Sequence, residues 1–102
     1  MVPHTFLLFV AGDGDLGLRA RTNFEATVLP ALARIGAGSS DISLDVIDIL
    51  TAPDVAREFG VVTTPMLIRT SPSPAVRLLG TLEQADVVLE LLELPPESDR
   101  PE

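Results

Sequence analysis

The 102-residue chain has no cysteine, no tryptophan and no tyrosine. Without cysteine it cannot form a disulfide, a thiolate metal site or a thiol nucleophile, so thiol chemistry is excluded. A single histidine, His4, stands close to the N-terminus. A lone histidine lacks the base or ligand partner that catalysis or metal binding needs, so we expect a solvated terminal side chain. The sequence therefore predicts no catalytic residue, cofactor or metal site.

Lysine is also absent: the seven basic residues are all arginines, set against 15 acidic residues, and the formal net charge is -8. Such a charge repels phosphate backbones and anionic lipid surfaces. We therefore predict neither a nucleic-acid partner nor a membrane partner. A basic protein surface is the kind of partner that this charge attracts.

Long hydrophobic runs are missing as well. The apolar run FLLFVAG, at 6–12, is too short to span a bilayer, and no basic segment of a signal peptide precedes it. Apolar residues make up 46% of the chain, which is enough for one modest core. We expect one cytoplasmic domain over residues 1–94, followed by a disordered polar tail at 95–102.

The first elements follow from apolar spacing. Thr5–Ala11 is a nearly continuous apolar run, typical of a strand buried on both faces. One helix face is then marked, at spacings of four, four and three, by Phe24, Val28, Leu32 and Ile35. Pro30 lies inside this pattern and is expected to kink or split the helix near Val28. Gly36 or Gly38 ends it.

A strand, a short helix and a Thr-Pro turn follow. The strand, Leu44–Leu50, has two mostly apolar faces with one aspartate on each, which suits a strand whose ends reach solvent. Thr51 is the expected cap of a helix that begins at Pro53 and ends at Gly60. The bond between Thr64 and Pro65 is expected to be cis, because cis peptides are inexpensive only before proline.

The C-terminal part predicts a hairpin and a last helix. MLIRT and AVRLL read as two strands joined by the stiff turn SPSP at 71–74. Thr81 and Gln84 form a capping-box pattern, which predicts a helix from Leu82 onwards. The order β-α-β-α-β-β-α, with right-handed crossovers, predicts an α/β thioredoxin-like fold: a mixed sheet with helices on both faces.

Three polar groups are candidate sites. Gly12–Asp15 is acidic, but it lacks the spaced oxygen ligands of a calcium loop, so a strand-to-helix turn is favoured. Asp45 and Asp48 point to opposite faces of a strand and cannot act as a carboxylate pair. Arg69 and Arg77 are expected on a solvated hairpin edge, with partner contact as the alternative.

Several segments together resemble the KaiB family of circadian clock proteins and the KaiB-like domains of associated histidine kinases. The matching segments are Val10-Ala11-Gly12, Val46–Leu50 with Pro53 and Ala56, Thr63–Leu67, and Pro72, Pro74, Arg77, Gly80 and Leu82. The resemblance covers nearly the whole chain up to Leu94.

This chain also departs from the family pattern. Gly60 replaces a lysine that clock KaiB proteins use to dock on the KaiC ATPase, Asp45 replaces a second lysine, and Thr81 stands where relatives carry aspartate. The connection between the helix and the next strand, at 36–41, is several residues longer than in clock KaiB proteins. These differences indicate a divergent member of the family.

The resemblance implies that such proteins can exchange a ground-state fold for the thioredoxin-like fold, with rearrangement after the Thr-Pro turn. MLIRT and AVRLL have strand patterns here, and residues 81–93 have helix signals. We expect the chain to populate the thioredoxin-like form.

The resemblance implies a non-enzymatic regulatory module that docks on a KaiC-like ATPase or a histidine kinase. A homo-oligomer is a further option. Exposed strand edges and short helices supply contacts for such docking. The predicted partner-binding residues are Asp45, Ile47, Ile49, Pro53, Arg57, Gly60, Thr64 and Pro65. The alternatives are a cysteine-less relic of a thioredoxin-like redox enzyme and a stress-response KaiB homologue acting outside any clock.

Overall fold

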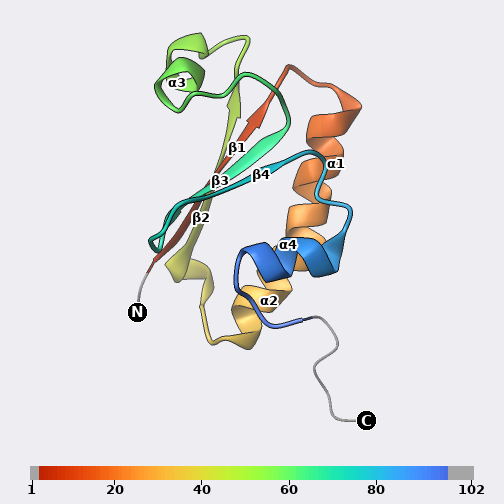
Figure 1. Ribbon diagram of the computed structural model, residues 1–102, viewed down its shortest axis with the longest axis vertical. Coiled ribbons are helices and arrows are strands. Elements are labelled where there is room, and N and C mark those ends of the chain that lie inside the picture. The colour runs from red at the N-terminus through yellow and green to blue at the C-terminus, as the bar shows by residue number, and fades with distance from the viewer. Residues whose placement is uncertain (1–2, 97–102) are drawn as a thin grey trace.

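The apolar run near the N-terminus forms β1, an inner strand of a four-stranded sheet (Figure 1). In this computed structural model, which describes residues 3–96, β1 (His4–Val10) runs parallel to β2 (Ile42–Asp48) and antiparallel to β3 (Met66–Ser71). β4 (Val76–Leu79) pairs antiparallel with β3, so the strand order is β2-β1-β3-β4. β2 and β4 are therefore the two sheet edges.

A long, continuous helical segment connects β1 to β2 and changes its hydrogen-bond pattern just before Pro30. It consists of α1 (Asp15–Asn23), the π-helical segment η1 (Phe24–Val28) and α2 (Leu29–Arg34). The helix is not split at Val28, because Val28 and Leu29 keep right-handed helical φ and ψ; instead, a π-helical stretch ends just before Pro30. Gly36 follows with φ +92°, and the short 3-10 helix η2 (Ser39–Asp41) leads into β2.

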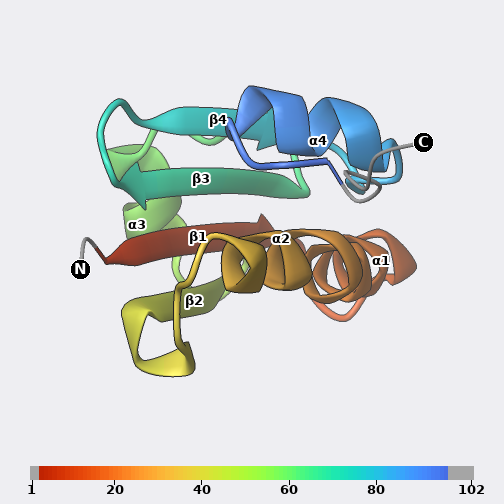
Figure 2. The ribbon, with the colours of Figure 1, turned by 90° about the horizontal axis from the view of Figure 1, so that it is seen from below.

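Helices cover both faces of the sheet, as predicted (Figure 1). One face carries α1, η1, α2 and α4 (Ala85–Leu91), and the other carries α3 (Pro53–Glu58). Figure 2 shows α1 and α2 beside β1 and β2, and α4 beside β3 and β4. The larger core centres on Phe6 and Phe24, whose ring centroids are 5.0 Å apart. The smaller core includes Phe9, Ala56, Val61 and Ile68.

Several local predictions were wrong. Residues 81–84 are not helical, because Leu82 has φ +64° and the Asn23 side chain donates to the Thr81 carbonyl at 2.8 Å. The capping box does not form, and α4 begins at Ala85 instead. A tertiary hydrogen bond has overridden the local helix signal.

The predictions for Thr51 and Ile35 also fail. The residue before α3 is Ala52, and the Thr51 hydroxyl donates backwards to the Asp48 carbonyl instead of capping the helix. β2 begins and ends earlier than predicted, which leaves Leu50 in the following turn. Ile35 lies just past the end of α2, where the helical direction is lost, and is 47% exposed.

Arg69 is buried rather than solvated, because β3 lies between β1 and β4. Its guanidinium donates to the carbonyls of Leu92, at 3.0 Å, and Pro74, at 2.9 Å. Arg69 thereby satisfies a carbonyl at the end of α4 and one in the hairpin turn. Arg77 points to the opposite face and is exposed, so the two arginines do not form a common edge.

The predicted tail at 95–102 lies mostly outside the described residues. Of its first two residues, Pro95 accepts a hydrogen bond from Arg34 at 2.9 Å.

Arg69→Ala is expected to lower the free energy of unfolding by about 2–3 kcal/mol, because it leaves the buried Leu92 carbonyl and the partly buried Pro74 carbonyl without their donor. Arg19→Ala is the control: its ion pair with Glu83 is more than half exposed on both sides, and its loss should cost under about 1 kcal/mol. Urea denaturation followed by far-ultraviolet circular dichroism measures both, since the chain lacks tryptophan and tyrosine. Equal losses would contradict the role of Arg69.

Residues 85–91 are expected to show helical secondary chemical shifts in solution, as α4 does here. Backbone assignment by NMR checks this directly. Strand-type shifts across Val87–Leu92 would show that the chain populates a different fold.

Candidate protein-docking site

Asp48, the last residue of β2, holds the C-terminal end of this strand in place. Its Oδ1 accepts hydrogen bonds from the backbone N–H groups of Gly12 and Leu50, both at 2.9 Å. The carboxylate thus joins the ends of β1 and β2, which are adjacent parallel strands. The sequence placed Asp48 on a strand face but gave no indication of this bracing role.

α3 is held against the sheet by a small apolar core and is ended by a glycine. Ala56 is buried, and the Phe59 ring lies 5.8 Å from that of Phe9. Gly60 has φ +68°, and the Val61 N–H donates to the Ala56 carbonyl at 2.9 Å. This is the Schellman arrangement that favours glycine, so the predicted helix end at Gly60 is confirmed.

A hollow of about 380 Å³ lies beside α3 and collects half of the predicted partner-binding residues. It is lined by Ile49, Pro53, Ala56, Arg57, Gly60, Val61 and Val62. Val62 is 86% exposed, although it follows the buried Val61 directly. Sequence reasoning missed Val62; the signal was an apolar pair immediately after a helix-ending glycine, of which only one member can face the core.

Asp45 and Ile47 lie on the side of β2 that faces α3. Their alternation with Val46 places them on the α3 face, where Ile47 packs partly against the smaller core and Asp45 is exposed. They lie on an edge strand but do not line the hollow.

Thr64 and Pro65 lie apart from the hollow beside α3. Their peptide bond is cis, as predicted, and Pro65 is buried, with its carbonyl accepting from the Gly80 N–H at 2.9 Å. Both residues border a smaller hollow of about 130 Å³ with the start of α1. Only Asp15 and Thr64 bring polar side chains to that lining, so it contains no nucleophile paired with a base.

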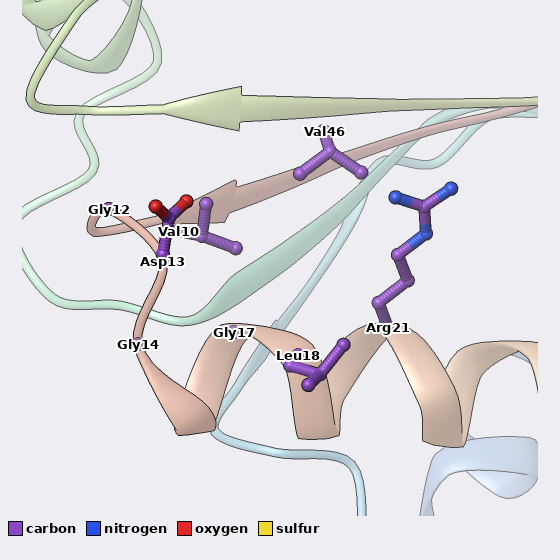
Figure 3. A pocket seen from close by; sticks show the side chains of 8 residues that line it. All are labelled: Val10, Gly12, Asp13, Gly14, Gly17, Leu18, Arg21 and Val46. Carbon is purple, nitrogen blue, oxygen red and sulfur yellow. The ribbon is translucent and has the colours of Figure 1, made fainter.

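A further hollow of about 280 Å³ lies on the opposite face of the sheet, between α1 and β2 (Figure 3). Gly17 lets α1 approach β1, because a Cβ there would lie 2.8 Å from Val10 Cγ1. Leu18 and Val46 give the hollow an apolar character, and Arg21 points towards it while pairing with Glu25 at 3.5 Å. The sequence did not indicate this hollow.

Within residues 3–96, no group of three histidine, cysteine, aspartate or glutamate side chains is placed to hold a metal ion. No helix in the same range is long and apolar enough to cross a membrane.

The fold is that of known thioredoxin-like structures. The N-terminal domain of SasA from Synechococcus elongatus superposes with a TM-score of 0.60 at 22% identity, covering 100% of this chain and 91% of that one. Mitochondrial thioredoxin 3 from Saccharomyces cerevisiae gives a TM-score of 0.64 at 14% identity, covering 89% of this chain and 78% of that one. These similarities confirm the predicted fold class.

The sequence relatives identify a family, which the fold alone does not. A circadian clock oscillator protein KaiB from Prochlorococcus marinus is 32% identical over 87 residues, which are 85% of this chain and 69% of the relative. A circadian clock protein KaiB3 from Synechocystis is 34% identical over 55 residues, or 54% of each chain. The family model for the KaiB domain matches residues 7–94. The chain therefore belongs to the KaiB family.

Proposed function

We propose that this protein is a regulatory binding module, acting in the cytoplasm, that docks on a KaiC-type ATPase or a histidine kinase in clock signalling. The contact area is the α3 surface, defined as Ile49, Pro53, Arg57, Gly60 and Val62. Asp45 and Ile47 extend this surface along β2. Thr64 and Pro65 contribute to docking through the cis turn that leads into β3.

The observation that carries the proposal is the hollow beside α3. It places four predicted contact residues around one concave surface, and Val62 stands exposed at its rim. An exposed apolar side chain beside a hollow is typical of an interface anchor, because a bound partner removes the side chain and the hollow from water. Arg57 contributes charge at the rim, where it pairs with Asp54 at 3.1 Å.

The names of the sequence relatives support a clock-related role rather than a redox one. The thioredoxin resemblance is one of fold, at 14% identity, and the chain has no cysteine with which to exchange thiols. The redox-relic alternative is therefore not favoured.

Val62→Asp is expected to reduce recovery of the partner about tenfold, as loss of a buried apolar anchor does. The test is a pull-down of a purified KaiC-type ATPase and of a histidine kinase by the tagged protein, with and without ATP. Leu18→Asp is the matched control: Leu18 is 65% exposed, but it lies on α1, on the other face of the sheet.

If the unsubstituted protein recovers neither the ATPase nor the kinase, the proposed function is wrong. If Val62→Asp and Leu18→Asp behave alike, the protein binds through a surface other than the α3 surface.

A further inference from the structure

The edge strand β4 offers unpaired backbone groups to solvent. The Gly80 N–H donates to the Pro65 carbonyl at 2.9 Å, and Leu78 pairs with Leu67 two positions further along the ladder. Backbone direction alternates along an antiparallel strand, so the N–H and C=O groups of Arg77 and Leu79 point away from β3. β4 is the last strand on its side of the sheet, and these groups have no neighbouring strand within residues 3–96.

A groove with both polar and apolar lining residues runs beside these free groups. It has a volume of about 370 Å³ and lies between β4 and α4, with Leu79, Val87 and Leu91 among its lining residues. Val87 and Leu91 are 41% and 51% exposed. The Leu79 side chain is 64% exposed and lies on the opposite face of β4, because Leu78 faces the larger core. Figure 2 shows β4 and α4 side by side at one margin of the molecule. We call this feature the β4 groove.

The charges around the β4 groove are mainly acidic. Glu83 lines it and is paired with Arg19 at 3.2 Å, whereas Asp86 and Glu90 are exposed on α4 beside Val87 and Leu91. Arg77 is a basic residue of the lining, but its guanidinium donates towards α3, to the carbonyl of Phe59. A second copy of this chain would bring the same carboxylates together and add another net charge of -8.

We propose that the β4 groove docks an extended segment of another protein, with small apolar residues at its centre and basic residues at its ends. The segment adds as a strand to β4 through the backbone of Arg77 and Leu79. Its apolar side chains cover Val87 and Leu91 on the α4 face and Leu79 on the opposite face, and its basic ends face Asp86 and Glu90. This surface is separate from the α3 surface and does not depend on the function proposed above.

The test uses the full ¹⁵N-labelled chain and a synthetic peptide of alternating valine and threonine with two lysines at each end. Binding is expected to slow amide exchange at Arg77 and Leu79, while Leu78, already turned towards β3, changes little. The same peptide with glutamates in place of the lysines should bind about tenfold more weakly at low salt. Equal binding of both peptides, or exchange unchanged at Arg77 and Leu79, would overturn the proposal.

Two pairs of variants make the test specific. Leu79→Pro removes an outward N–H, a change that an edge strand tolerates, and should abolish protection at Arg77, whereas Leu79→Val should retain it. Glu90→Lys should weaken peptide binding about tenfold, whereas Asp13→Lys makes the same change in net charge at the turn after β1 and should not. Protection at Arg77 and Leu79 that grows with protein concentration without peptide would instead identify a second copy as the occupant, and would overturn the proposal.

Discussion

Burial of β1 on both faces is the constraint on which the architecture depends. Phe6 and Leu8 face the larger core and Phe9 the smaller one, and each is almost fully buried. A strand in this position must have a partner on each side and a helical layer above and below. β2 and β3 supply the strands, and α3 on one side and α1, η1, α2 and α4 on the other supply the cover.

With β1 and β3 inside the sheet, β2 and β4 are necessarily its edges. The two edges differ in what surrounds them. β2 adjoins the hollow beside α3, whereas β4 faces the groove beside α4. The acidic charge of the chain makes both surfaces more suitable for basic partners than for copies of the chain itself. The fold thus separates the two proposed contact areas across the width of one small sheet.

Sequence reasoning succeeded where a single physical cause decides the outcome. The apolar run of β1, the helix irregularity before Pro30 and the helix end at Gly60 each follow from burial or from backbone geometry alone. Sequence reasoning failed where a residue far away in the sequence determines the local conformation. Thr81 has a good local capping pattern, but Asn23, far away in the sequence, holds its carbonyl.

The candidate site shows the same division. Ile49, Pro53, Arg57 and Gly60 lie within one short stretch of sequence, and the structure brings them together around one hollow. Thr64 and Pro65 follow closely in sequence, but the turn carries them to the start of α1. Arg69 was misplaced because its burial depends on which strands flank β3, and pairing order is not contained in the local pattern.

The hydrogen bond from Arg69 to the end of α4 has a consequence for local opening of the molecule. α4 has only seven residues, and an isolated helix of that length is not stable in water. It is held by the packing of Val88, Leu89 and Leu92 and by the Arg69 guanidinium on β3. When α4 opens, β3 and β4 lose their cover and Arg69 loses an acceptor. Loss of α4 is therefore coupled to loss of the Arg69 contacts, and the β3–β4 hairpin and α4 form one cooperative unit.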